Sequence, residues 1–238
     1  MLHAFPYGET SKIVRLSTRD HGVQSVIAKG ASRPRSRFGA GLQVLSEGVA
    51  HFYLKAHRDL HTLSAFDVTE QHAALAADLQ RYASAVAVAE LVLRFSPAEP
   101  NPDVYEMLRA ALDHLVHADA NRVPQVGLAA LWRTVVILGF APSVDVCVRC
   151  GGPLGARARF SVAEGGLLCP GCGAGVKAGE LGQRDQQALA AFVAGATDAP
   201  DLPADHLAAH RRLLVRFVVR HVAEDRDLHA LTFWETAP

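Results

Sequence analysis

Two short stretches, Cys147-Val148-Arg149-Cys150 and Cys169-Pro170-Gly171-Cys172, contain all four cysteines of the 238-residue chain. Eighteen residues, 151–168, separate them. In a CxxC turn the second sulfur folds back beside the first, so two such turns can supply the four thiolates of a tetrahedral shell. The spacing therefore predicts a structural zinc site, one Zn²⁺ per chain, formed by Cys147, Cys150, Cys169 and Cys172.

Two disulfides or a thiol redox pair are the alternatives to zinc. The chain opens with Met1-Leu2-His3-Ala4-Phe5-Pro6, which does not resemble a secretory signal, and neither CxxC has the strand and helix that flank a thioredoxin-like motif. Four thiolates close the coordination shell, so the metal is expected to stabilise the fold and not to act on a substrate. A hairpin over 160–168, turning at Glu164-Gly165-Gly166, is expected between the two pairs.

Composition predicts a globular protein whose N-terminal part is basic. Half of the residues are hydrophobic, and no run approaches the roughly 20 apolar residues that span a bilayer, so we expect a cytoplasmic location. The net charge is zero, yet residues 1–60 contain nine Lys and Arg against four Asp and Glu, a net charge of +5. A basic module joined to an acidic body favours a polyanionic partner for that module.

The first 66 residues have the pattern of short β-strands. Apolar residues alternate or cluster in five segments separated by turn residues; the expected strands are 2–5, 11–17, 23–29, 48–54 and 60–66. Five short strands without helical crossovers fit a small closed barrel of the OB-fold type, because closure removes the exposed strand edges.

From residue 67 the apolar period becomes helical. Helices are expected over 73–95, 125–138, 184–194 and 204–222. A further helix is expected between the first two of these, capped by Asn101 and with Pro102 in its first turn. The zinc module interrupts this helical body. The predicted class is α+β, with four segments: an OB-fold domain (1–66), a first helical part (67–146), the zinc module (147–176) and a second helical part (177–238).

A basic segment follows the third expected strand. Arg33, Arg35 and Arg37 alternate, so in an extended loop their side chains would lie on one side and meet successive phosphates. Phe38 offers a stacking face beside them, as expected for single-stranded nucleic acid. A loop whose charges only keep the barrel soluble is the alternative. The candidate DNA-binding residues are Lys12, Arg15, Lys29, Arg33, Arg35, Arg37 and Phe38.

Other motif-like features do not indicate catalysis. His57-Arg58-Asp59-Leu60 spells a kinase tetrapeptide without the remaining kinase motifs, and no Walker sequence or GxSxG elbow occurs. His206 and His210 are one helical turn apart, but no acidic residue is spaced with them as a zincin requires, so a solvated helix face is expected. No catalytic residue is predicted.

Several segments together resemble the bacterial DNA repair protein family RecO. They are Phe5-Pro6-Tyr7-Gly8-Glu9-Thr10-Ser11-Lys12-Ile13-Val14, Ala28-Lys29-Gly30-Ala31-Ser32-Arg33 with Ser36-Arg37-Phe38-Gly39, and the CxxCG and CPxC pair. The resemblance covers nearly the whole chain. It implies an N-terminal OB-fold, a helical domain with an inserted zinc module, and a bacterial, nucleoid-associated location.

The resemblance also implies a function without catalysis. Family members bind single- and double-stranded DNA, anneal complementary strands, and work with RecR to load RecA onto strands coated by single-strand binding protein. The acidic, apolar C-terminal tail of that protein is expected to bind the helical domain near a basic residue, for which Arg133, Arg212 and Arg216 are candidates. The alternative hypothesis is an interaction adaptor whose helical body binds partners without binding DNA. A zinc-dependent hydrolase is disfavoured by the closed thiolate shell.

Overall fold

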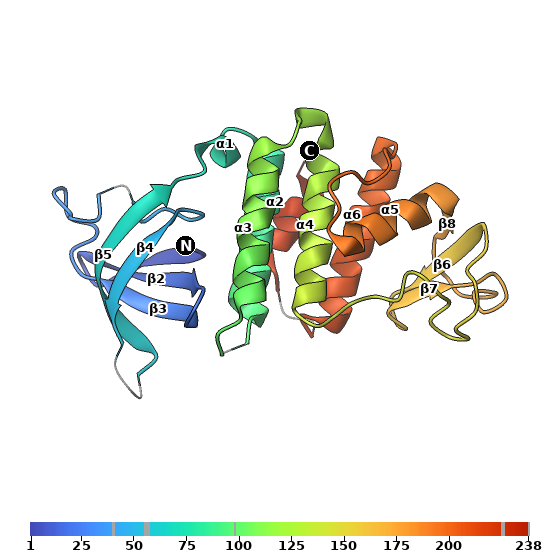
Figure 1. The fold of residues 1–238 in the computed structure, drawn as a ribbon, viewed down its shortest axis with the longest axis horizontal. Helices are drawn as coiled ribbons and strands as arrows, with labels where there is room; N and C mark the ends of the chain where they lie inside the picture. The colour runs from blue at the N-terminus through green and yellow to red at the C-terminus, as the bar shows by residue number, and fades with distance from the viewer. Residues whose placement is uncertain (40, 55–57, 98, 225–226, 238) are drawn as a thin grey trace.

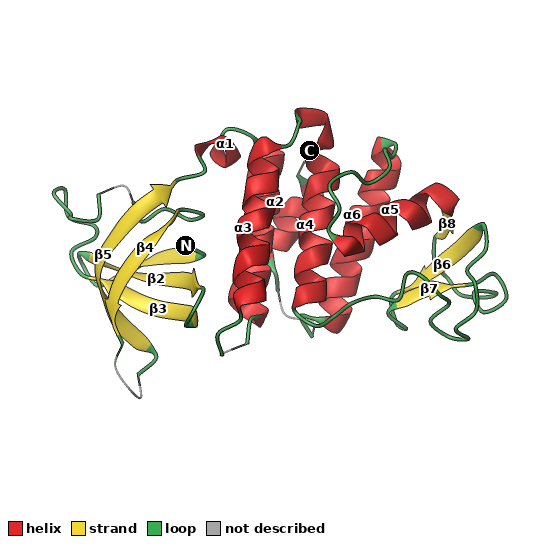
Figure 2. Cartoon of the chain, in the orientation of Figure 1, coloured by secondary structure: helices red, strands yellow, loops and turns green. Residues whose placement is uncertain are grey.

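The structure is a computed structural model that describes residues 1–39, 41–54, 58–97, 99–224 and 227–237. Figure 1 shows an elongated molecule with a β-barrel at the N-terminal end, helices in the middle and a second, smaller sheet at the far end. Strands therefore occupy both ends and helices the centre (Figure 2). None of the helices among the described residues combines the length and the hydrophobicity that a membrane span requires.

The N-terminal domain has the strand order of an OB-fold. Its strands are β1 (His3–Tyr7), β2 (Ser11–Thr18), β3 (Gly22–Ala28), β4 (Glu47–Tyr53) and β5 (Leu60–Glu70). They are arranged β1-β2-β3-β5-β4, with β3 and β5 parallel and the other neighbours antiparallel, which is the topology of a five-stranded, partly open barrel. β5 continues to Glu70, so the last strand is longer than the sequence pattern predicts.

The barrel core forms because side chains along each strand point alternately to the two faces of the sheet. Side chains on one face of the curled sheet form a separate apolar cluster: Val14, Leu16, Val26, Ala28, Ala31, Phe38, Leu42 and Leu63. The two edge strands, β1 and β4, meet through the residues that precede them. The Met1 amine donates to Ser46 O (2.6 Å), and Leu45 N donates to Met1 O (2.9 Å). The sheet is thus partly open and joined at this one point.

The helical body is built around α4 (Val123–Ile137), eleven of whose fifteen residues are buried. Such a helix must be covered on all sides, and it packs against α2 (Leu79–Phe95), α3 (Pro102–His117), α5 (Gln183–Ala194) and α6 (Ala204–His221). Asn101 caps α3 by accepting from Val104 N at 3.2 Å, and Pro102 lies in the first turn, as predicted. A 3₁₀ turn (Ala120–Arg122) precedes α4.

Two features of the helical body differ from the prediction. The helix expected over 73–95 is two helices, α1 (Ala73–Ala76) and α2, because Asp78 accepts from Arg81 N at 2.8 Å and starts a new helix. A short C-terminal helix, α7 (His229–Thr236), was not predicted. Its eight residues are too few to show a periodicity. It is held by α2, where Glu90 Oε2 accepts from Ala230 N and Leu231 N, each at 3.0 Å.

The small sheet is the insertion between α4 and α5. Its strands are β6 (Arg157–Ser161), β7 (Gly166–Leu168) and β8 (Glu180–Gly182), in the order β7-β6-β8. The hairpin predicted between the cysteine pairs is the β6–β7 hairpin, and β8, which pairs with the other edge of β6, was not predicted. His221 Nε2 lies 2.5 Å from Val162 O and joins the hairpin turn to the end of α6.

Candidate metal centre and nucleic-acid interface

The four cysteines gather at one point of the insertion. Their sulfur atoms all lie within 4.8 Å of one another, and Cys150 Sγ and Cys169 Sγ are 3.9 Å apart. A tetrahedron of thiolates around zinc, with Zn–S bonds of about 2.3 Å, has S–S edges of about 3.8 Å. The predicted metal-ligating residues therefore come together with the geometry of a four-thiolate site.

Tight backbone turns present each pair of sulfurs. Gly151 N donates to Cys147 O and Gly173 N donates to Cys169 O, both at 2.8 Å, so the two CxxC turns have the same closing hydrogen bond. Gly151 has φ +70°, a backbone conformation that a residue with a Cβ atom adopts only with strain. The glycine after the first pair thus lets the chain turn away from the sulfurs.

Arg149, inside the first CxxC, ties the two halves of the site together. Its guanidinium donates to both oxygens of Glu164, at 3.0 and 2.6 Å, and to Cys172 O at 2.7 Å. This bidentate pair holds the pKa of Glu164 below its usual range and raises the pKa of Arg149. Sequence analysis did not identify this residue, although an arginine between the cysteines and a glutamate in the predicted hairpin turn were visible.

Without a metal, the pKa values of two of the thiols are shifted in opposite directions. Hydrogen bonding from the backbone of Cys169 lowers the pKa of Cys147 to about 6, whereas hydrogen bonds from Cys150 and Cys169 raise the pKa of Cys172 to about 12. Four thiolates at this separation repel one another unless a cation lies between them. The donor set and its electrostatics therefore fit a soft divalent ion.

The barrel presents a surface of aromatic and cationic side chains on its outer face. Strand register puts Phe5 opposite Ile13 and His3 opposite Arg15, and paired residues point to the same side of the sheet. The same side of β3 contains Ile27, which is paired with Ile13. Phe5 and Tyr7, two residues apart on β1, are 39% and 50% exposed. Sequence analysis missed these two aromatics, whose alternation on β1 was the available signal.

The predicted basic loop has a different conformation from the one expected. Residues 31–39 form consecutive tight turns, closed by Arg33 N to Gly30 O (3.2 Å), Ser36 N to Arg33 O (3.0 Å) and Gly39 N to Ser36 O (3.1 Å). The prediction of an extended strip of alternating arginines is therefore wrong, because Gly30, Pro34 and Gly39 favour turns. Arg33 and Arg35 are exposed, and Ser32 N donates to Thr10 O (2.9 Å), which places the turns beside the β1–β2 connection.

Phe38 is not a stacking platform. Only 5% of it is exposed, and it belongs to the apolar cluster inside the barrel. Arg37 covers it, with Cζ 4.9 Å from the ring centroid, and donates to Leu63 O at 3.4 Å. The prediction was wrong because a lone aromatic beside charges does not reveal whether it closes a core or faces solvent.

The remaining predicted DNA-binding residues are divided between the two faces of the sheet. Lys12 and Arg15 are three residues apart on β2, so they point to opposite faces. Arg15 lies on the outer face with Ile13, and Lys29 is exposed in the turn that follows β3. The structure therefore brings Arg15 to the aromatic surface, leaves Lys12 off it, and places Lys29 in an exposed turn at the end of β3.

His206 and His210 do not form the solvated face that was expected. Asp185, at the start of α5, lies between them, with its Oδ1 2.8 Å from His206 Nδ1 and 3.3 Å from His210 Nε2. The His210 side chain is only 3% exposed, and burial lowers its pKa, whereas the hydrogen bond to Asp185 raises the pKa of His206. The three side chains join α5 to α6.

A groove of about 790 Å³ separates α6 from the small sheet. Three acidic side chains line it: Glu180 pairs with Arg157 at 3.1 Å, Asp185 pairs with the two histidines, and Asp205 lies at the start of α6. Its basic side chains Lys177, Arg212 and Arg216 form no ion pair with any described residue. Arg133 lies in another groove, of about 490 Å³, whose lining also includes Asp103 and Glu106.

Comparison with known proteins identifies the family. The family model described as recombination protein O N terminal matches residues 1–72, and the model described as recombination protein O C terminal matches residues 76–229. The chain belongs to the recombination protein O family. RecO is a non-catalytic recombination mediator, which agrees with the prediction that the chain is not an enzyme.

Individual relatives agree with this assignment. The chain is 36% identical over 179 residues to the DNA repair protein RecO of Anaeromyxobacter sp. (strain K), an alignment that covers 74% of this chain and 69% of the relative. It is 33% identical over 173 residues to the DNA repair protein RecO of Rubrobacter xylanophilus, covering 72% and 68%. The resemblance seen in the sequence is thereby confirmed, and the protein is a RecO-family DNA repair and recombination protein.

Proposed function

We propose that this RecO-family protein binds single-stranded DNA on the outer face of β1–β3 and helps complementary strands to anneal. One observation carries the proposal: Phe5 and Tyr7 are half exposed on the same face as Arg15. Aromatic rings can stack with bases of any sequence, and cations beside them contact the phosphates. The surface offers both kinds of contact without a preference for particular bases.

Charge neutralisation explains how such a surface would promote annealing. Two strands repel through their phosphates, and a protein that binds either strand with Arg15, Lys29, Arg33 and Arg35 reduces that repulsion. Phosphate contacts do not distinguish one strand from two, so the same cations also serve double-stranded DNA. Neither role needs a bond to be broken.

A salt series with charge variants tests the interface. The affinity of Arg15→Gln/Lys29→Gln for a single-stranded oligonucleotide should fall, and the slope of log affinity against log salt should decrease by about 1.4, because each phosphate contact contributes about 0.7. Arg94→Gln/Arg184→Gln removes the same charge from exposed sites on the helical body and should leave the slope unchanged. Equal slopes in the wild type and the first variant would refute the interface.

The metal proposal is one structural zinc ion per chain, bound by Cys147, Cys150, Cys169 and Cys172. When bound, the ion supplies the cross-link between the two CxxC turns and its binding free energy stabilises the insertion, on the order of 10 kcal/mol for such sites. Metal analysis should give one zinc ion per wild-type chain. In Cys150→Ser the insertion should lose its structure. Full zinc content in a Cys147→Ser/Cys172→Ser variant would disprove the site.

The groove beside α6 is the proposed site for the acidic, apolar C-terminal tail of single-strand binding protein. Arg212 and Arg216 are preferred over Arg133 because three basic side chains, Lys177, Arg212 and Arg216, line their groove, whereas Arg133 is the one Lys or Arg among the described residues that line the other groove. Titration with a labelled tail peptide should show about tenfold weaker binding to Arg212→Gln/Arg216→Gln. Weaker binding to Arg133→Gln instead would place the tail between α3 and α4.

The wider role follows from the family. We propose that the protein works with RecR to load RecA onto strands coated by single-strand binding protein, in the bacterial cytoplasm at the nucleoid. Tight binding of the tail peptide and of RecR with no binding to DNA at low salt would favour the alternative, an interaction adaptor. Annealing of complementary oligonucleotides that depends on Arg15 and Lys29 would favour the mediator.

A further inference from the structure

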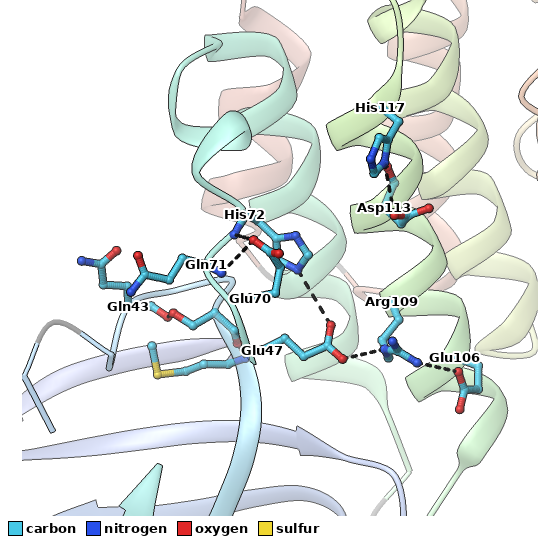
Figure 3. Close-up of polar contacts among 11 residues, drawn as sticks. Gln43, Glu47, Glu70, Gln71, His72, Glu106, Arg109, Asp113 and His117 are labelled. Carbon is cyan, nitrogen blue, oxygen red and sulfur yellow. Dashed lines mark hydrogen bonds and ion pairs between the residues drawn. The ribbon is translucent and has the colours of Figure 1, made fainter. Parts of the chain in front are cut away.

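A groove of about 480 Å³ lies where the barrel meets the helical body. One wall comes from the start of β4, the end of β5 and the connection to α1, and the other wall is one face of α3. Figure 3 shows His72, on the barrel side, directed toward the carboxylate of Glu47, which in turn points toward Arg109 on α3. The site is distinct from the cysteine cluster and from the outer face of the barrel.

The groove has an excess of negative charge. Four carboxylates line it, from Glu47, Glu70, Glu106 and Asp113, against one guanidinium, from Arg109. Arg109 is already shared between two of the acids, with Nε 2.7 Å from Glu47 Oε1 and Nη1 3.5 Å from Glu106 Oε2. Glu106 also pairs with Arg19, at 3.4 Å. Two of the four carboxylates, one on each wall, are therefore left without an arginine partner among the described residues.

These two carboxylates, Glu70 and Asp113, have no Lys or Arg partner among the described residues. Glu70 Oε1 accepts from the backbone N–H groups of Gln71 (2.9 Å) and His72 (2.8 Å), which lowers the pKa of this carboxyl and keeps it ionised. Asp113 faces only His117, whose Nδ1 is 3.2 Å away. Both acids are open to solvent and to an incoming cation.

His72 provides an independent sign that something binds here. It has φ +49°, an unusual conformation for a residue other than glycine, and its side chain is nine-tenths buried. Its Nε2 has no hydrogen-bond partner and lies 3.9 Å from Glu47 Oε2. A buried nitrogen without a partner is destabilising, and backbone outliers of this kind cluster at functional sites.

We propose that this junction groove docks a Lys- or Arg-bearing segment of a partner protein. A guanidinium has five N–H donors in a plane, so it can reach carboxylates on both walls and donate to His72 Nε2. A nucleic-acid strand is repelled by the same carboxylates. A divalent cation needs converging donors, and among the described residues the four cysteines are the only group of three or more metal-type ligands that converge.

The test uses a fluorescein-labelled Gly-Arg-Arg-Gly-Arg-Arg-Gly peptide as the probe and the full chain at low salt. Glu70→Gln/Asp113→Asn should bind the peptide at least about tenfold more weakly than the wild type. Asp59→Asn/Asp198→Asn removes the same charge from exposed positions outside the groove and should bind as the wild type does. His72→Asn keeps a residue that tolerates positive φ and should bind several-fold more weakly.

Three results would overturn the proposal. Equal weakening in the groove variant and in the control variant would show general attraction between opposite charges. Absence of binding to the wild type at low salt would show that the groove takes no basic segment. Displacement of the peptide by millimolar Mg²⁺ in the wild type but not in Glu70→Gln/Asp113→Asn would identify a cation site. None of these outcomes depends on DNA binding.

Discussion

At the scale of single residues, Gly127 shows how packing can outweigh helix propensity. Alanine normally stabilises a helix by about 1 kcal/mol relative to glycine. A Cβ at position 127 of α4 would lie 2.5 Å from Ser84 Oγ, which accepts a 3.0 Å hydrogen bond from Trp234 Nε1. The contact joins three helices, so a shift of Ser84 to admit a Cβ would disturb its hydrogen bond with Trp234.

Gly127→Ala is therefore expected to destabilise the protein, by about 1–3 kcal/mol. Urea unfolding monitored by circular dichroism measures the change. Gly179→Ala is the matched control, because nothing lies within 4 Å of the Cβ it would add. An increase in stability for Gly127→Ala would show that α2, α4 and α7 pack less closely than described.

Besides the four cysteines, we expect Arg149 to determine the metal affinity of the site. Removing groups that orient metal ligands typically lowers metal affinity by about 10- to 100-fold. The chelator concentration that removes zinc from Arg149→Met should therefore be about 10- to 100-fold lower than the concentration that removes it from the wild type. Arg157→Met, which breaks only an exposed pair with Glu180, is the control. Identical chelator curves for the two variants would mean that Arg149 does not support the site.

Sequence analysis was accurate for residues whose spacing defines their chemistry and inaccurate where burial decides the role. The four cysteines converge as their spacing predicts, since a CxxC turn is a local structure. Phe38 and His210 were both expected at the surface, and both are buried by residues distant in the chain. Phe5 and Tyr7 were overlooked because only the register of β1 against β2 shows what surrounds them.

At the scale of elements, α2 holds the ends of two other helices. Arg81 donates from Nη1 to Leu115 O (2.5 Å) and from Nη2 to Ala118 O (2.6 Å), which satisfies carbonyls at the C-terminal end of α3. Glu90 accepts from the first N–H groups of α7. A cation at a helix C-terminus and an anion at an N-terminus both oppose the helix dipole.

The two caps predict separate effects on the two helices. Arg81→Met should destabilise the protein by about 2 kcal/mol, and Glu90→Gln by about 1 kcal/mol. Hydrogen exchange should show faster exchange of α7 amides, led by Ala230 and Leu231, in Glu90→Gln only. Unchanged protection of α7 in that variant would contradict the cap. Arg94→Met, an exposed change on the same helix, is the control.

The contact between α5 and α6 should depend on pH. Asp185 raises the pKa of His206 above its ordinary value of 6.5, so the stabilising pair is fully formed below that pH and is lost as pH rises through the raised pKa. His206→Ala should thus lower stability at about pH 5.5 and have little effect at about pH 8.5. A difference from wild type that grows with pH would contradict this pairing. His114→Ala, an exposed histidine on α3, is the control.

Elements were predictable in proportion to their length. The five strands and the helices α3 to α6 were expected from periodicity and from caps such as Asn101, and they are present. β8 and α7 are short, and each exists because a neighbour pairs with it or caps it. The break between α1 and α2 depends on one aspartate cap, which an alanine-rich periodicity conceals.

At the scale of the whole molecule, the order of parts could be predicted and their contacts could not. The sequence indicates a basic barrel followed by a helical body that the cysteine insertion interrupts, and in space the barrel and the insertion lie at opposite ends with the helices between them (Figure 1). The junction of Glu47, His72 and Arg109 joins residues that are far apart in sequence. Ion pairs across such a junction leave no periodic pattern in the sequence, so they could not be predicted from it.

The central claim is that single-stranded DNA binds to the outer face of the barrel through exposed aromatics. The most direct measurement is the affinity of Phe5→Ser/Tyr7→Ser for a single-stranded oligonucleotide by fluorescence anisotropy. Tyr82→Ser/Phe233→Ser, one tyrosine and one phenylalanine of similar exposure on the helical body, is the matched control. Loss of stacking should weaken binding of the first variant by about 1–3 kcal/mol per base and leave the control unchanged; equal affinities of the two variants and the wild type would contradict the claim.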